Sequence, residues 1–375
     1  MMKIKIDRQK NNPLIQSYYD NDIDKFRKLI KSGANVNCVN NTGCSLIELV
    51  ITHDCLSESC EFFDVLMENK VYLCKIGDAQ NLLYLAMMHK RRDYFNKMLD
   101  SGIDINWYKP LSYNGLSYNP IIFDAVSFGK DYYINLLLDK GVDISGTTNF
   151  GDPILVHHIT CCKTKFTKKI GSELLLRFID SGADLNERGY NDMSPMHCTI
   201  FNGLNHLLEI LLDNSVGLEL NIRDSKGNTA LIYATIHNNP CAVKMLIDKG
   251  AILNISNVHN ETSLILSVKN NKFEIFNLLL ENSSCISSVD KNGCNILHYM
   301  IEYDKWIWKD EEIQKYYVKI IEKYPDLMFV KNKKGETPMD LLYSNQKNNR
   351  MKKVFINSMK NINNSKLSTK EAMSL

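Results

Sequence analysis

The residues best suited to metal binding or catalysis are two histidines and two cysteines between positions 157 and 162. In the stretch HHITCC, His157 precedes Cys161 by four positions and His158 precedes Cys162 by four. Residues four apart lie on one face of a helix, so each pair could share a zinc ion. Zinc usually takes three or four protein ligands, and the sequence shows no complementary pair elsewhere. We therefore expect an ordinary helix here, and a metal-binding or enzymatic protein centred on His157–Cys162 stays the alternative.

Other catalytic patterns are weak. Cys198 follows His197 directly, but adjacent residues of a helix face different directions and do not form a thiol and base pair. The sequence also lacks a Gly-rich phosphate loop followed by Lys and Ser or Thr, a GxSxG turn and an HExxH helix. We predict that the protein is not an enzyme, has no catalytic or metal-binding residues and needs no cofactor.

Composition indicates a folded, water-soluble protein. The 375 residues are 44% apolar and 23% charged, and the net charge of +2 gives no general attraction to nucleic acid or anionic lipid. No apolar run approaches the roughly 20 residues that cross a bilayer, and no secretory signal is present. Eleven cysteines without a regular spacing indicate reduced thiols. We expect a monomeric, cytoplasmic protein that binds neither nucleic acid nor membranes.

A recurring six-residue phrase predicts the ends of several helices. It reads SGANVN at 32–37, SGIDIN at 101–106, KGVDIS at 140–145, SGADLN at 181–186 and KGAILN at 249–254. Each copy follows apolar residues at helical spacing, such as Phe26, Leu29 and Ile30. Glycine takes the left-handed conformation that closes a helix, and Asp or Asn then favours a turn. The phrase therefore predicts a helix end followed by a tight reversal.

Prolines and polar caps predict where helices start. Six of the eight prolines directly follow Asn, Asp, Ser or Thr, which is the order of an N-cap and a first helical residue. The predicted repeat starts are Pro13, Ser45, Leu82, Pro120, Pro153, Pro195, Ala230, Ser263, Ile296 and Pro338. The step from Ala230 to Ser263 and from there to Ile296 is 33 residues. A repeat of this length with two helices is typical of ankyrin arrays.

The stretch NTALIYATIHNNPCAVKMLIDKGAILN, residues 228–254, resembles an ankyrin repeat almost position by position. His197 and His298 stand at the structural histidine of that family, and GETPMDLL at 335–342 keeps its Thr and Pro. The resemblance covers about residues 12–357 and implies an all-α ankyrin-repeat solenoid of about ten helix-turn-helix units with short hairpin-like turns. We expect a flexible lead at 1–11, the array at 12–345, a capping helix at 346–360 and a flexible tail at 361–375.

Three departures from the repeat are candidate partner contacts. The insertion before the fourth repeat carries Trp107, Tyr108, Tyr113 and Tyr118, aromatic residues that are favoured interface anchors. The link between the two helices of the fifth repeat is expected to be a loop carrying Lys163, Lys165, Lys168 and Lys169. The ninth repeat carries Trp306 and Trp308. The alternatives are aromatic residues that fill gaps between imperfect repeats and lysines that are simply solvated.

The resemblance implies a non-enzymatic scaffold or adaptor that binds a partner protein through a concave face and inserted loops. Similar viral and bacterial proteins join such arrays to a second domain, so an adaptor recruiting a modifying enzyme is an alternative, although few residues flank the predicted array. Their resemblance, together with the Asn-, Lys- and Ile-rich sequence, suggests a host-directed effector in the host cytosol. Asn106 and Asn186 resemble asparagine-hydroxylation sites of ankyrin turns and are candidates for modification.

Overall fold

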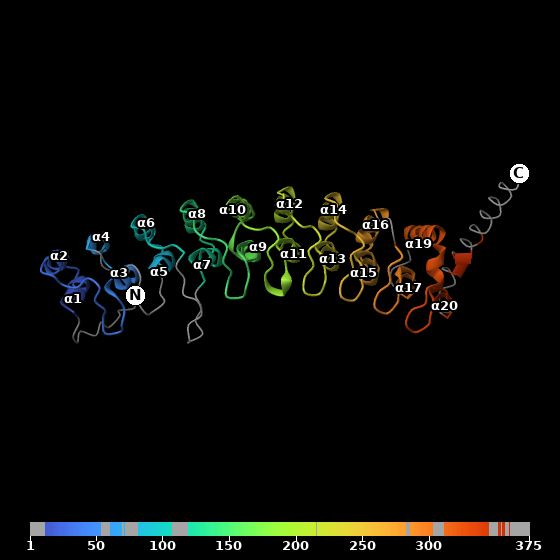
Figure 1. The fold of residues 1–375 in the computed structure, drawn as a ribbon, viewed down its shortest axis with the longest axis horizontal. Coiled ribbons are helices and arrows are strands. Elements are labelled where there is room, and N and C mark those ends of the chain that lie inside the picture. The colour runs from blue at the N-terminus through green and yellow to red at the C-terminus, as the bar shows by residue number, and fades with distance from the viewer. Residues whose placement is uncertain are drawn as a thin grey trace. The chain divides into compact units, whose positions relative to one another are not determined.

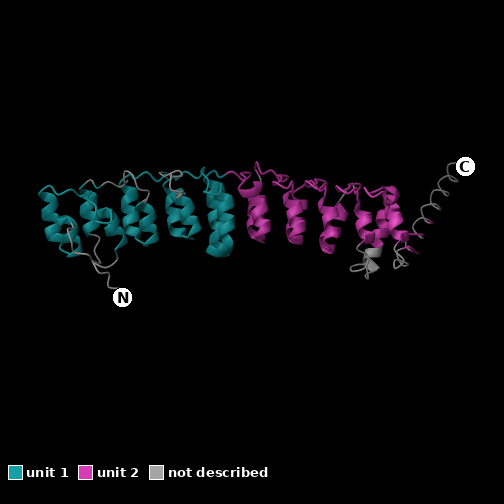
Figure 2. Ribbon diagram, turned by 90° about the horizontal axis from the view of Figure 1, so that it is seen from below, with its two compact units in different colours: residues 1–183 teal, residues 184–375 magenta. Residues whose placement is uncertain are grey.

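The computed structural model describes residues 12–53, 61–69, 71, 82–106, 119–214, 216–282, 286–302, 311–344, 352–353, 355–356 and 360. Over these residues the chain is helical, and β-structure is limited to isolated bridges such as Val39 to Ser45. The predicted all-α fold is therefore confirmed. The chain divides into two compact units, Met1–Ala183 and Asp184–Leu375, which Figure 2 colours separately.

The first unit is a succession of helical pairs. In Figure 1 the odd-numbered helices lie in one layer and the even-numbered helices in a second layer above it. We call these the first and second helices of each pair. Their bounds are α1 (Pro13–Tyr19), α2 (Ile23–Lys31), α3 (Leu46–Thr52), α4 (Glu61–Glu68), α5 (Leu82–Met88), α6 (Arg92–Asp100), α7 (Ile121–Ser127), α8 (Asp131–Asp139), α9 (Ile154–Lys165) and α10 (Lys168–Asp180).

The second unit repeats the arrangement, with α11, α13, α15, α17 and α20 as first helices (Figure 1). Two short 3-10 helices, η1 (Tyr190–Asp192) and η2 (Pro325–Phe329), stand between pairs. The α-helices are α11 (Pro195–Phe201), α12 (Asn205–Asp213), α13 (Ala230–Ile236), α14 (Pro240–Asp248), α15 (Ser263–Lys269), α16 (Phe273–Asn282), α17 (Ile296–Glu302), α19 (Glu311–Lys323) and α20 (Pro338–Ser344).

Polar caps explain where many helices begin. The Asn12 side chain accepts a hydrogen bond from the Leu14 N–H at 2.9 Å, with Pro13 in the first turn. Two prolines depart from the prediction. Pro120 and Pro153 occupy the N-cap itself, so α7 and α9 begin one residue later than expected. Ser45 is likewise the cap of α3.

The predicted glycine phrase closes helices by a specific hydrogen-bond pattern. After α10, the Gly182 N–H donates to the Ile179 carbonyl at 2.9 Å and the Ala183 N–H to the Phe178 carbonyl at 3.0 Å. Gly182 takes a φ of +91°, which costs a residue without a side chain little. The chain can therefore leave the second helix sharply and start the next turn.

The core of each unit is a seam between neighbouring pairs. In the second unit α13 packs against its partner α14 and against the first helices α11 and α15 on either side. Leu207, Leu211 and Leu246 on the second helices are fully buried in this seam. A single helical pair could not bury these side chains, so each repeat depends on its neighbours for stability.

Candidate functional site

In Figure 1 the turns that connect the pairs project beyond the layer of first helices. Four of these turns in the second unit have the same construction, and we call them the tip turns: residues 223–228, 256–261, 289–294 and 331–336. Each is closed by one Asp or Asn side chain that accepts two main-chain hydrogen bonds. The Oδ1 atom of Asp224 accepts from the Lys226 N–H at 2.9 Å and from the Asn228 N–H at 2.7 Å. The same role falls to Asn257, Asp290 and Asn332.

The tip turns are joined to one another through the main chain. The Val258 N–H donates to the Lys226 carbonyl at 2.9 Å, and the Lys291 N–H donates to the His259 carbonyl at 2.8 Å. The Lys333 N–H likewise donates to the Asn292 carbonyl, also at 2.8 Å. These bonds fix the distance from each tip turn to the next, so side chains on the four turns form a row with a regular spacing.

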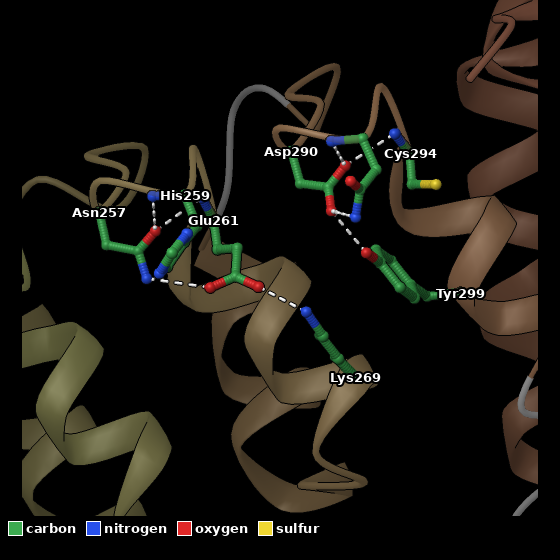
Figure 3. A network of polar contacts seen from close by, with 8 residues as sticks. Asn257, His259, Glu261, Lys269, Asp290, Cys294 and Tyr299 are labelled. Atoms are coloured by element: carbon green, nitrogen blue, oxygen red, sulfur yellow. Dashed lines mark hydrogen bonds and ion pairs between the residues drawn. The ribbon is translucent and has the colours of Figure 1, made fainter. Parts of the chain in front are cut away.

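Acidic side chains of the tip turns bond to side chains of the first helices, as Figure 3 shows. The Tyr299 hydroxyl on α17 donates to Oδ2 of Asp290 at 2.6 Å. Burial, then the bond to Asp290, raises the pKa of Tyr299, which therefore stays protonated as a donor. In the preceding turn, Glu261 accepts from Lys269 at 2.6 Å and from Asn257 at 3.0 Å. The carboxylates of Asp290 and Glu261 are therefore hydrogen-bonded within the protein.

An aromatic cluster lies where two first helices of the second unit end. Phe201 closes α11 and is 57% exposed, and Ile236 closes α13 and is 40% exposed. The Phe201 ring meets the His237 ring edge to face at 5.2 Å between centroids, and His237 stacks on Tyr233 at 5.6 Å. Large apolar side chains held in place but left in water are typical of binding surfaces.

The histidine and cysteine group at 157–162 lies on α9. The His158 ring is buried, and its Nε2–H donates to the Gly171 carbonyl at 2.9 Å. Burial lowers the pKa of His158 to about 4 and raises the pKa of Cys162 to about 12, so the imidazole and the thiol are both neutral. His157 is engaged by Ser127, with 2.9 Å between Oγ and Nε2. Nε2 of each ring thus has a hydrogen-bond partner within the protein.

No group of three or more His, Cys, Asp or Glu residues suited to a metal ion occurs in the described ranges. None of the helices described there has the length and apolar character that crossing a membrane requires.

The expected lysine loop is wrong, because these residues are helical. Lys163 and Lys165 belong to the last turn of α9, Lys168 and Lys169 to the first turn of α10, and two residues separate the helices. Ile159 and Cys162 continue the buried face of α9, which favours the extra turn. The Thr167 hydroxyl then caps α10 by accepting from the Ile170 N–H at 3.3 Å.

Asn106 and Asn186, the candidates for modification, link consecutive turns. The Asn186 Oδ1 accepts from the Glu219 N–H at 2.8 Å, while its amide donates to the Gly217 carbonyl at 2.7 Å. The Asn106 Oδ1 accepts in the same way from the Asp143 N–H at 2.8 Å. Both side chains therefore have a structural role, which the predicted modification would have to accommodate.

His197 and His298 connect one repeat to the next. The Ser194 N–H donates to Nδ1 of His197 at 3.2 Å, and Nε2–H donates to the Asn228 carbonyl at 3.0 Å. His298 makes the corresponding bonds to Asn295 at 3.1 Å and to Glu336 at 3.2 Å. Because one ring nitrogen accepts and the other donates, both rings are neutral. Burial lowers the pKa of each.

Trp107, Tyr108, Tyr113, Tyr118, Trp306 and Trp308 lie outside the described residues. The tip turns and the Phe201 cluster were not among the contacts predicted from the sequence. A signal for the tip turns was present, because DSKGN, DKNGC and NKKGE each place Asp or Asn three residues before Gly, an order that favours a side-chain-closed turn. Phe201 gave no signal, since a helix end is exposed or buried according to its neighbours.

Comparisons with known proteins agree with this geometry. A family model described as ankyrin repeats, in three copies, matches residues 167–257. The putative ankyrin repeat protein L371 of Acanthamoeba polyphaga mimivirus is 26% identical over 48% of the chain and 24% of its own length. The fowlpox virus protein FPV034 is 25% identical over 45% of the chain and 36% of its own length.

A second mimivirus protein, the putative ankyrin repeat protein L92, is 25% identical over 75% of the chain and 68% of its own length. The chain thus spans only about a quarter of L371 and about a third of FPV034. The matched segment 167–257 runs from the cap of α10 to the tip turn after α14, and the same helical pairs continue on both sides of it. The chain contains ankyrin repeats over residues 167–257.

Proposed function

We propose that the protein is a non-enzymatic scaffold or adaptor that holds a partner protein on its first helices and projecting turns. Ankyrin repeats are in general protein-interaction modules, and proteins built from them are typically non-enzymatic. The observation that carries the proposal is the aromatic cluster of Phe201, Tyr233, Ile236 and His237. The rings of Phe201, Tyr233 and His237 contact one another, and the Phe201 and Ile236 side chains are exposed. All four residues lie in the segment that the family model matches.

The proposal extends to the irregular parts of the repeats. Trp107, Tyr108, Tyr113, Tyr118, Trp306 and Trp308 are proposed as further contacts, and Lys163, Lys165, Lys168 and Lys169 as a basic patch on the α9–α10 elbow. Asn106 and Asn186 are proposed as modification sites. A host-directed role in the cytosol of a host cell is supported by the viral ankyrin proteins to which the chain is similar.

Affinity capture with a double variant tests the aromatic cluster. Changing Phe201 and Ile236 to serine should leave the fold intact, because the two side chains are already 57% and 40% exposed. We expect recovery of the partner proteins to fall about tenfold, since exposed aromatic anchors carry much of an interface's free energy. Phe329→Ser is the matched control, because Phe329 is 52% exposed but lies on η2, away from the cluster. Equal recovery by all three proteins would remove the cluster from the binding surface.

The aromatic insertion needs a separate variant in which Trp107, Tyr108, Tyr113 and Tyr118 become serine. If these residues contact a partner, the same proteins are recovered in smaller amounts. If they fill a gap between repeats, recovery is unchanged per folded molecule while the unfolding temperature falls. The two outcomes separate the contact from the packing role.

A further inference from the structure

The charged side chains of the four tip turns are sorted by sign. The acidic residues are Asp224, Glu261 and Asp290, which are buried, and Glu336, which is half-buried. The basic residues are Arg223, Lys226, Lys291, Lys331, Lys333 and Lys334, and all six are exposed. His259 is exposed in the turn between Lys226 and Lys291. The outer surface of the tip turns therefore carries positive charge almost alone.

The acids do not neutralise this surface, because internal bonds occupy them. Asp224 and Asp290 close their own turns, and Glu261 pairs with Lys269 of the first helix α15. Glu336 accepts from the amide of Asn332 at 3.3 Å. Among the ion pairs of the described residues, none involves Lys226, Lys291, Lys333 or Lys334.

The sorting is specific to these turns. The corresponding turns described in the first unit, 39–44 and 147–152, contain no Lys or Arg. Positive charge therefore does not follow from the turn itself, which closes equally well with Asn40 or Thr148 as the accepting residue. We call the exposed side chains of Lys226, His259, Lys291, Lys333 and Lys334 the basic row.

The main-chain bonds between the turns set the spacing of the basic row. Consecutive repeats are as far apart as packed helices, about 8–10 Å. A peptide in the polyproline II conformation advances about 3.1 Å per residue with three residues per turn, so every third side chain faces the same way and comes level with a new tip turn. A ligand whose negative charges recur at that interval can meet each turn in succession without distortion.

We propose that the basic row binds an extended acidic segment of a partner protein, with carboxylates about three residues apart. This inference rests on the proposed scaffold function and names the chemistry of one ligand. Val258, which is 44% exposed, and Val289, which is 38% exposed, stand on the same turns and offer apolar contacts to the residues between the carboxylates. A peptide presents both kinds of group, whereas a nucleic-acid backbone presents phosphates without apolar side chains between them.

Fluorescence anisotropy with labelled synthetic peptides tests the inference. One peptide carries glutamate at every third position, and a second has the same composition with its glutamates contiguous. We expect the first to bind about tenfold more tightly, and added salt to weaken it, because exposed charges are screened. Equal affinities would show only diffuse attraction and would overturn the inference. Equally tight binding of single-stranded DNA of matched charge would also overturn it and assign the row to nucleic acid.

Charge-reversal variants locate the binding. The triple variant K226E, K291E and K333E should bind the spaced peptide at least about tenfold more weakly. The matched control K244E, K315E and K319E makes the same charge change at exposed positions of the second helices α14 and α19 and should stay within about twofold of the wild type. A loss of the same size in the control would refute the basic row as the site. If the tip variant still captures the partner proteins that the Phe201 variant loses, the inference fails and the scaffold function stands.

Discussion

At the scale of single residues, buried neutral histidines connect the repeats. His197 replaces water for two main-chain groups, the Ser194 N–H and the Asn228 carbonyl, which belong to different turns. The Asn228 carbonyl also accepts from the Asp224 N–H at 2.9 Å, so the ring matters most to the Ser194 N–H. A histidine in this position therefore acts as a hydrogen-bonded bridge between two repeats.

His197→Ala should lower the free energy of unfolding by about 1–3 kcal/mol, because it leaves the buried Ser194 N–H without its acceptor and removes one of the two donors to the Asn228 carbonyl. Chemical denaturation followed by circular dichroism measures the loss. His259→Ala is the control, since the His259 side chain is exposed and the bonds of that residue come from its main chain. A loss of the same size in both variants would contradict the bridging role.

His158 predicts a loss of stability in acid. Burial lowers the pKa of His158 from 6.5 to about 4. Between these two pH values the unfolded chain therefore binds a proton at this residue and the folded chain does not. The stabilisation is complete above pH 6.5 and is lost as the pH falls towards 4, by about 3 kcal/mol. His158→Gln removes this titration, so its unfolding free energy should vary less over that interval. Identical pH profiles for the two proteins would contradict the prediction.

At the scale of elements, α9 and α10 differ from the other pairs of the first unit by their length, 12 and 13 residues. The extra turn of α9 reaches the reversal between α7 and α8. A Cβ atom on Gly129 would lie 2.9 Å from the Lys165 carbonyl oxygen. The extra turn of α9 therefore leaves no room for a side chain at position 129. The lysines at 163, 165, 168 and 169 follow the helices, and their exposed charge is presented from a rigid elbow.

Gly129→Asn tests this packing. Asparagine tolerates positive φ and occupies the matching reversals at Asn21, Asn238 and Asn271, so backbone strain alone is modest. The collision with α9 should nevertheless cost about 1–3 kcal/mol of unfolding free energy. Gly203→Asn is the matched control, because a Cβ there meets nothing within 4 Å. If thermal melts show equal losses for both variants, α9 does not restrict the reversal.

The sequence predicted the repeat but not the way in which turns are joined. Glycines such as Gly182 and caps such as Asn12 act on their own segment, so their effect can be inferred locally. The bond from the Val258 N–H to the Lys226 carbonyl depends on how two repeats stack, which no local signal contains. The lysine segment differs for a related reason: its extra residues predicted a longer link between the helices, but they continue α9 and place Cys162 on its buried face.

At the scale of the whole molecule, a net charge of +2 hides a local separation of sign. In the second unit the tip turns direct their acids inward and their bases outward, and the exposed rings of Phe201 and His237 lie at the ends of first helices in the same unit. The second helices carry the buried leucines of the seam. The proposed scaffold function therefore places partner binding on the first helices and turns, and structural support on the second helices.

Hydrogen–deuterium exchange with and without a captured partner protein tests this assignment most directly. With the partner bound, we expect slower exchange at the ends of α11 and α13 and in the four tip turns, because bound surfaces open less often. The tip turns are residues 223–228, 256–261, 289–294 and 331–336. The second helices α12, α14 and α16 should exchange as in the free protein. Protection confined to those second helices, with unchanged exchange in the tip turns, would contradict it.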